Sequence, residues 1–268
     1  MLVPPAHALT REAFFIYGRL ASGKSSIWDS TAEAYRRYGN TARFHVISTE
    51  PERAYVTVER HKDWADNITI YEPERTYQGL LSACQLIHTV ATKDDFLVID
   101  SIGSCFDWVR NNWFEGHFDK DFRAYQAEGK RLVGKSAEVQ PHQWIQMNEM
   151  YKQWMIGSVL GFPGHRIVVA QAEGLFERSP TSDQDWDKGH IRDTYGHIGF
   201  KPVGYKFDDY YFHSLWYAHR DPRSNKLTLK TVKDKPGRRW MDNEEVADLS
   251  IDGFVTTYLR GIANWETT

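Results

Sequence analysis

The sequence has few of the features that mark secreted and membrane proteins. Its 268 residues include only two cysteines, Cys84 and Cys105, whose spacing suits neither a metal site nor a disulfide framework. No apolar run approaches the roughly 20 residues that a membrane-spanning helix needs. The N-terminus lacks the basic and apolar stretches of a signal peptide. We therefore expect a cytoplasmic protein without a membrane partner.

A surplus of positive charge is also missing. The formal net charge is −3 at pH 7, so no overall basic field attracts nucleic acid, and any such contact needs a local patch. The chain has neither an internal repeat nor a low-complexity tract. Its length suits one domain with added segments, so we expect a single domain over residues 1–268.

Short apolar segments alternate with helical patterns along most of the chain. The expected strands are 13–17, 44–48, 67–71, 96–100 and 166–170, with helices around 24–38, from Pro51, and around 80–88. This alternation predicts an α/β fold with a mainly parallel sheet flanked by helices. Two later strands, about 208–219 and 226–233, are joined by a turn and predict an antiparallel extension near the C-terminus.

Three segments depart from this alternation. Residues from about 105 to 160 carry no strand signal and predict a helical insertion, with helices around 118–132 and 142–160. Residues from about 174 to 204 are polar and glycine-dotted, and so long a segment without periodicity predicts a mobile loop that is either functional or disordered. A final helix is expected over about 243–262.

The strongest motif reads G-x-x-x-x-G-K-S. It comprises Gly18, Arg19, Leu20, Ala21, Ser22, Gly23, Lys24 and Ser25, with Ser26 next. An apolar strand precedes it and a helix follows, which is the setting of a phosphate-binding P-loop. In such a loop, backbone N–H groups bind phosphates, Lys24 reaches the β- and γ-oxygens, and the Ser25 hydroxyl ligates Mg²⁺. The motif predicts binding of ATP with Mg²⁺.

Asp100 ends the apolar strand 96–100, where a Walker-B aspartate holds Mg²⁺ beside the P-loop hydroxyl. The alternative is that Asp100 only caps the following helix. Ser101 comes next, where many P-loop motors have a catalytic glutamate, so the general base must lie elsewhere. Glu50, just after the strand 44–48, is the candidate. Its alternative is a charge that favours the N-terminus of the helix from Pro51.

Further polar residues lie at the ends of later strands. Gln171 follows the strand 166–170, where an amide can sense the γ-phosphate. Lys233 and Lys235 alternate on a strand end and therefore point to the same side. A solvated basic hairpin is the alternative interpretation of these lysines.

The segment 174–204 mixes cations with aromatic residues. Its candidate nucleic-acid contacts are Arg178, Lys188, Arg192 and Lys201. Cations for phosphates and rings for bases suit a single strand. Acidic residues in the same segment leave a solvated loop as the alternative.

In this order, the parts resemble the core of the RecA-type ATPases. The family's catalytic glutamate, Walker-B Asp-Ser pair and strand-end glutamine are matched by Glu50, Asp100-Ser101 and Gln171. Its strand ending in a polar-Pro pair is matched at Glu72-Pro73. Its DNA-binding loop is matched by 174–204, and its Lys-x-Lys strand, which reaches a neighbour's nucleotide, by Lys233-Asp234-Lys235.

This resemblance implies a RecA-like P-loop NTPase core, ATP hydrolysis with Glu50 as base, and a homo-oligomeric ring or filament. It also implies DNA as a partner, single-stranded DNA being favoured. The chain looks similar to compact RecA-like ATPases of bacteriophages, which suggests recombination, repair or replication of phage DNA in a host cytoplasm. Three alternatives remain: a terminase-like packaging motor, a small-molecule kinase with 174–204 as lid, and an assembly factor switched by ATP.

Overall fold

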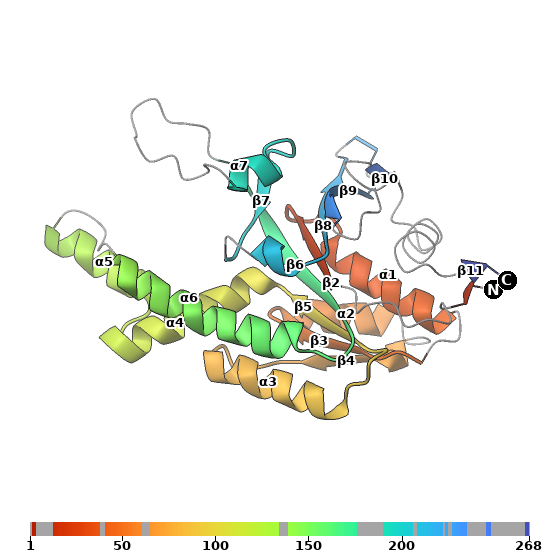
Figure 1. The fold of residues 1–268 in the computed structure, drawn as a ribbon, viewed down its shortest axis with the longest axis horizontal. Coiled ribbons are helices and arrows are strands. Elements are labelled where there is room, and N and C mark those ends of the chain that lie inside the picture. Colours follow the sequence, from red (N-terminus) through yellow and green to blue (C-terminus); the bar gives the residue numbers. More distant parts are fainter. Residues whose placement is uncertain are drawn as a thin grey trace.

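The computed structural model describes residues 2–3, 13–37, 41–60, 65–133, 139–175, 190–205, 208–221, 223–224, 227–234, 245–247 and 266–267. Figure 1 shows a central twisted sheet with helices on both faces and a helical arm extending to one side. None of the helices in the described ranges is long and apolar enough to cross a membrane.

In the part of the chain that the structure describes, the central sheet has nine strands. Along its main path the order is Glu245–Ala247 (β10), Leu227–Asp234 (β9), Ser214–Arg220 (β8), Ala13–Gly18 (β2), His165–Gly174 (β6), Phe96–Asp100 (β5), Phe44–Ser48 (β3) and Ile68–Tyr71 (β4). The strands from β8 to β4 run parallel, and β9 and β10 are antiparallel additions. The predicted α/β fold, with its antiparallel extension, is therefore confirmed.

The parallel strands are apolar throughout because both of their faces are covered. In β2, Phe14 and Ile16 enter one buried cluster, which includes side chains of Lys24–Arg37 (α1). Phe15 and Tyr17 enter a second cluster, which includes side chains of Tyr77–Val90 (α3). Successive side chains of a strand point to opposite faces, so helices on both sides bury the whole of β2.

Two short elements precede β4 in the chain. These are the helix Pro51–Arg60 (α2) and the 3₁₀ helix Ala65–Asn67 (η1). Near the termini, Leu2–Val3 (β1) and Glu266–Thr267 (β11) pair antiparallel in a separate two-stranded sheet.

The helical insertion contains one more helix than the sequence predicts. Its elements are Ile102–Phe118 (α4), Phe122–Val133 (α5), Pro141–Trp154 (α6) and the π-helix Met155–Leu160 (η2). The prediction missed α4, whose glycines and asparagines lower its helix propensity. Its buried residues nevertheless recur at helical spacing.

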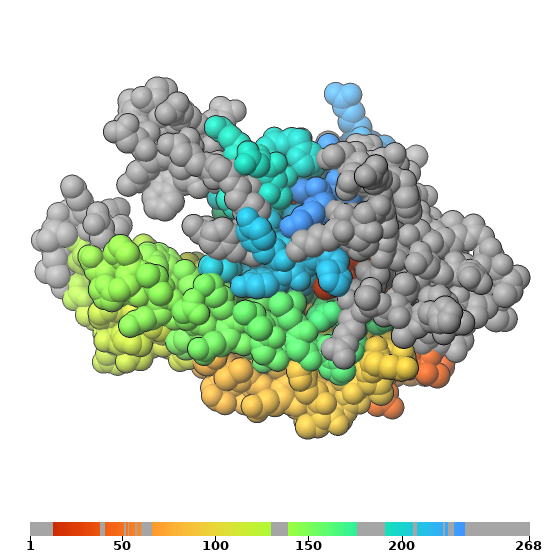
Figure 2. Space-filling view, in the orientation of Figure 1, coloured from red at the N-terminus to blue at the C-terminus, as the bar shows by residue number. Residues whose placement is uncertain are grey.

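The insertion also has a small core of its own, which includes Trp113, Phe114, Phe122 and Met147. In Figure 2 the green surface of this insertion lies directly above the yellow-orange surface of α3. The helical insertion thus continues the helical layer that covers one face of the sheet.

Three further expectations need correction. Residues 174–204 are not loop throughout, because they include the helix His190–Tyr195 (α7) and the strand Phe200–Pro202 (β7), which pairs antiparallel with the end of β6. The prediction of a helix over 243–262 is wrong at Glu245–Ala247, which form β10. The other residues of the range 243–262 lie outside the described ranges.

The third correction concerns the strand expected from residue 208. Asp208–Tyr211 form a 3₁₀ helix (η3), and β8 begins only at Ser214. The Tyr151 hydroxyl lies 3.0 and 2.9 Å from the two carboxylate oxygens of Asp208. Burial raises the pKa of Asp208 well above its usual value. The 3₁₀ turn lets this buried carboxyl group meet a hydrogen-bond donor.

Candidate functional site

The P-loop joins the end of β2 to the start of α1. Gly23 has φ = 80° and Ala21 has φ = 59°, so the loop passes twice through the left-handed region. A Cβ on Gly18 would lie only 2.4 Å from the carbonyl oxygen of Ala218 on β8. Glycine at position 18 therefore allows β8 to approach the first residue of the loop.

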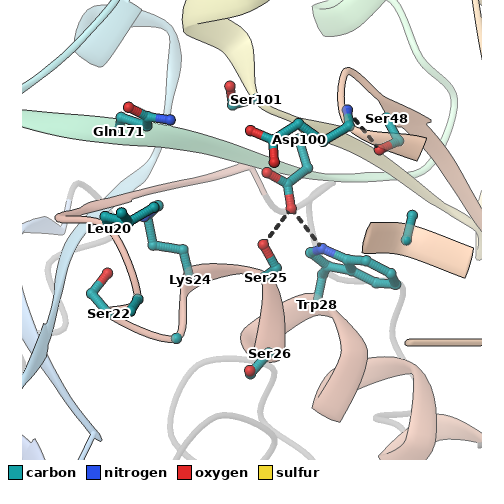
Figure 3. A pocket seen from close by; sticks show the side chains of 14 residues that line it. Leu20, Ser22, Lys24, Ser25, Ser26, Trp28, Ser48, Asp100, Ser101 and Gln171 are labelled. Carbon is teal, nitrogen blue, oxygen red and sulfur yellow. Dashed lines mark hydrogen bonds between the residues drawn. The ribbon is translucent and has the colours of Figure 1, made fainter. Parts of the chain in front are cut away.

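A cavity of about 190 Å³ opens above the loop at the carboxyl edge of the sheet (Figure 3). The predicted site residues that line it are Leu20, Ala21, Ser22, Gly23, Lys24, Ser25, Ser26, Glu50, Asp100 and Gln171. They come from the P-loop after β2, from α1, β5 and β6, and from the turn after β3, because parallel strands bring their carboxyl ends to one edge. The structure thus brings together the groups that the motifs predicted separately.

Asp100 and Ser25 meet at the centre of this cavity. The Ser25 hydroxyl donates a 2.6 Å hydrogen bond to Asp100 Oδ2 (Figure 3). A hydroxyl and a carboxylate are the hard oxygen ligands that Mg²⁺ takes together with substrate phosphates and water. Among the described residues no group of three or more His, Cys, Asp or Glu could hold a metal. The pairing of the Ser25 hydroxyl with the Asp100 carboxylate fits a Mg²⁺ ion that is bound jointly with a nucleotide.

Lys24 lies along the wall of the cavity. Its Nζ donates a 2.7 Å hydrogen bond to the carbonyl oxygen of Arg19, across the turn of the loop. Arg19 in turn lies outside the cavity lining, with its guanidinium carbon 5.6 Å from the centroid of the Phe200 ring. Within the P-loop, Lys24 thus lines the cavity and Arg19 faces β7.

Glu50 reaches the cavity from the turn between β3 and α2. Its N–H donates to Ser48 Oγ at 3.2 Å. Thr49 fastens the same turn to β5, since its N–H donates to the carbonyl oxygen of Asp100 at 2.7 Å. Thr49 Oγ1 also accepts a 3.0 Å hydrogen bond from the N–H of Ser101. These bonds hold the backbone of Glu50 next to Asp100.

Gln171 lies beside the P-loop, paired in register with Gly18 across β2 and β6. The sequence predicts a strand that ends here, but β6 continues to Gly174. The carbonyl oxygen of Gln171 accepts a 2.7 Å hydrogen bond from the N–H of Val203, just after β7. Gln171 therefore lies where the cavity adjoins the segment after β7.

Of the two lysines predicted at the end of β9, the described one, Lys233, does not line this cavity. Lys233 Nζ donates to the carbonyl oxygen of Asp209 at 3.4 Å and lies 5.4 Å from the centroid of the Tyr210 ring. It lines a separate groove of about 600 Å³ with His197 and Lys230. Lys235 lies outside the described residues.

The candidate nucleic-acid contacts are only partly described. Arg178 and Lys188 lie outside the described residues, and Arg192 is exposed on α7. The Nζ of Lys201 lies 3.5 Å from Glu173 Oε1, and its side chain is only 16% exposed. Arg192 is thus the more accessible of the two described cations.

Sequence reasoning missed Trp28, which also lines the cavity. Its indole Nε1 donates a 3.2 Å hydrogen bond to Asp100 Oδ2 (Figure 3). The signal was available in the spacing, because Trp28 comes one helical turn after Lys24 and Ser25 and so shares their side of α1. Ser48, Ala54 and Ser101 complete the lining and were not predicted as members of it.

No family model matches the chain, and no curated protein matches it in sequence. Among solved structures it is similar to one described as an ATPase domain, with 11% identity and a TM-score of 0.46 over 96% of this chain and 85% of that one. It is also similar to the KaiC-like protein PH0186 from Pyrococcus horikoshii OT3, with 10% identity and a TM-score of 0.45 over 90% and 87% of the two chains.

The strand order of the chain itself identifies its fold. The P-loop strand β2 and the Asp100 strand β5 are separated by β6, and β3 and β4 follow on the far side of β5. The P-loop connects β2 to α1, and the cavity lies at the carboxyl ends of the parallel strands. The chain has a RecA-like P-loop fold.

Proposed function

We propose that this protein is a Mg²⁺-dependent ATPase of RecA type that works as a homo-oligomer and is stimulated by DNA. The observation that supports hydrolysis best is the single cavity lined by the P-loop, Asp100, Glu50 and Gln171. A nucleotide hydrolase needs groups that bind the phosphates, ligands for a metal ion and a general base in one place. These residues supply all three.

In the proposed reaction, P-loop N–H groups and Lys24 bind the phosphates of ATP. Ser25 and Asp100 hold Mg²⁺, which when bound neutralises charge on the β- and γ-phosphates. The oxygen of the attacking water bonds to the γ-phosphorus as the bond to ADP breaks, and Glu50 accepts a proton from that water. Gln171 senses the γ-phosphate and transmits its presence toward β7.

The direct test is phosphate release by the wild-type protein, measured with and without Mg²⁺ and with no DNA, single-stranded DNA or double-stranded DNA. We expect Mg²⁺-dependent hydrolysis that single-stranded DNA stimulates. Tight ATP binding without turnover would instead support the assembly factor. Transfer of phosphate to a small acceptor would support the kinase, and stimulation by double-stranded DNA alone would support the packaging motor.

The contacts of β7 support a link between the segment 174–204 and hydrolysis. The Tyr17 hydroxyl, at the end of the P-loop strand, donates a 3.2 Å hydrogen bond to the carbonyl oxygen of Phe200. Burial, with a further contribution from Tyr217, raises the pKa of Tyr17, so this hydroxyl stays neutral and remains a donor. DNA bound near α7 would therefore act on the P-loop strand through β7.

Removing cations from this segment should weaken DNA binding and leave the DNA-independent ATPase rate intact. Single-strand affinity falls with salt by a slope of about 0.7 for each phosphate contact. Combined replacement of Arg178, Lys188 and Arg192 by alanine should thus reduce the slope of log affinity against log salt by about 2.

The matched control is Lys201→Ala, which removes a cation already paired with Glu173 and should change the slope little. The measurement is a salt titration of binding to a labelled oligonucleotide. An unchanged slope in the triple variant would mean that the segment is a lid or a protein contact.

The position of Lys233 supports catalysis shared between subunits. It lies outside the cavity lining of its own chain, so it would supply charge to a γ-phosphate only at a neighbour's site. Activity per subunit should then rise with protein concentration as the oligomer forms.

A mixing experiment tests this idea. Subunits carrying Lys24→Ala and subunits carrying Lys233→Ala with Lys235→Ala should each be inactive alone. Mixed together, about one interface in four has an intact P-loop facing intact lysines in a head-to-tail assembly, so part of the activity should return. Light scattering verifies that the two variants assemble together. If they do so and no activity returns, the lysines act within their own subunit or take no part in the reaction.

A further inference from the structure

Two donors converge on one oxygen of the Asp100 carboxylate. Ser25 Oγ lies 2.6 Å from Oδ2, and Trp28 Nε1 lies 3.2 Å from the same atom (Figure 3). Both donors come from α1, one helical turn apart. Because the described donors share Oδ2, the second oxygen, Oδ1, remains available to a metal ion or to a metal-bound water.

The two donors differ in what else they can do. The Ser25 hydroxyl carries lone pairs as well as a proton, so it can donate to Asp100 and ligate a cation simultaneously. The indole N–H of Trp28 can only donate, so it cannot be a metal ligand itself. Its contact with Asp100 can therefore act on a bound metal ion only through the carboxylate.

Packing fixes the direction of that donor. Trp28 is 1% exposed and belongs to the buried cluster between α1 and the sheet, with Phe14 and Val98. A large ring in a close-packed interior occupies one rotamer, so the N–H cannot turn away as a surface side chain would. A buried indole N–H also needs a partner, and Asp100 provides one.

We propose that Trp28 is the positioning residue of the Mg²⁺ site, holding Asp100 Oδ2 so that the carboxylate presents Oδ1 to the ion. This inference rests on the proposed function, because it assumes that Asp100 and Ser25 bind Mg²⁺ with a nucleotide. It adds a residue that acts on metal affinity through its hydrogen bond to Asp100.

The test removes the N–H and keeps the ring. Site-specific replacement of Trp28 by benzothienylalanine exchanges the N–H for a sulfur atom in a side chain of nearly the same shape, and Trp28→Phe serves as a second variant. ATP binding is measured by calorimetry over a series of Mg²⁺ concentrations and in EDTA. A hydrogen bond to a charged group is worth enough that the half-saturating Mg²⁺ concentration should rise about 10-fold.

In both variants the half-saturating Mg²⁺ concentration should change far more than the affinity for ATP in EDTA. A general loss of folding would instead lower the affinity for ATP in EDTA together with the affinity for Mg²⁺. Trp216→Phe is the matched control, because Trp216 lies in the same buried cluster but does not line the cavity. It should lower thermal stability and leave the Mg²⁺ requirement as in the wild type.

A double-mutant cycle with Asp100→Asn identifies the route. Removing the N–H should have little effect on the Mg²⁺ requirement once the carboxylate is gone, because the two groups act through one contact. A benzothienylalanine variant with the wild-type Mg²⁺ requirement would overturn the proposal and leave Trp28 a packing residue. If ATP binding by the wild-type protein does not depend on Mg²⁺, the proposed function itself fails and this inference falls with it.

Discussion

Lys24→Ala should reduce ATP hydrolysis by at least about 10³-fold while the chain remains folded, because it removes the cation that faces the transferred phosphate. Lys24 is the one basic side chain among the described residues that line the cavity. No neighbouring lysine or arginine of the described lining can replace it. In the structure it donates to the carbonyl oxygen of Arg19, and losing one partly exposed hydrogen bond costs little stability.

The measurement is steady-state phosphate release, with thermal unfolding measured in parallel. Lys93→Ala provides the control, since Lys93 is an exposed lysine before β5 and should keep wild-type activity. A well-folded Lys24→Ala protein with normal turnover would contradict the nucleotide site.

Glu50→Gln should lower kcat by roughly 10²–10⁴-fold and preserve nucleotide binding. The amide keeps the shape of the side chain and its capacity to accept a hydrogen bond, but it cannot take a proton from the attacking water. The bonds of Thr49 to Asp100 and Ser101 are unaffected, so the geometry of the turn should survive. A loss in kcat without a matching loss in ATP affinity distinguishes the base from a structural acid.

Glu52→Gln is the matched control for this substitution. Glu52 is exposed in the first turn of α2 and is absent from the described cavity lining, so the same chemical change there should leave kcat nearly unchanged. Should Glu50→Gln keep most of its rate, Glu72 after β4 becomes the next candidate.

The sequence predicts the parallel strands well because each is a short apolar run with polar residues at its end. The bounds of β3 and β5 agree with the prediction. Asp100 and Glu50 could be placed at the same edge because each lies at the carboxyl end of a strand predicted to be parallel. Local pattern carries less information where a tertiary contact decides the structure. Thus β7 forms because it pairs with the end of β6, and β10 because it pairs with β9.

The site shows the same division. The P-loop is a contiguous motif, whereas the contact of Trp28 with Asp100 joins residues 72 positions apart. No local pattern reports that an indole nitrogen will meet a carboxylate on another strand. For Lys233, the alternation along β9 predicted a shared side with Lys235, but not the contacts with Asp209 and Tyr210.

The crowding around Gly18 affects how a saturation mutagenesis experiment should be interpreted. A side chain there would collide with the carbonyl oxygen of Ala218 and with Ser22 Oγ, each 2.4 Å from the added Cβ. Intolerance at position 18 would therefore report the seam between β2 and β8, whether or not the protein ever binds a nucleotide. Intolerance at Lys24 reports the ligand. Gly18 and Lys24 of the motif would thus be selected for different reasons: Gly18 by assembly of the sheet and Lys24 by chemistry.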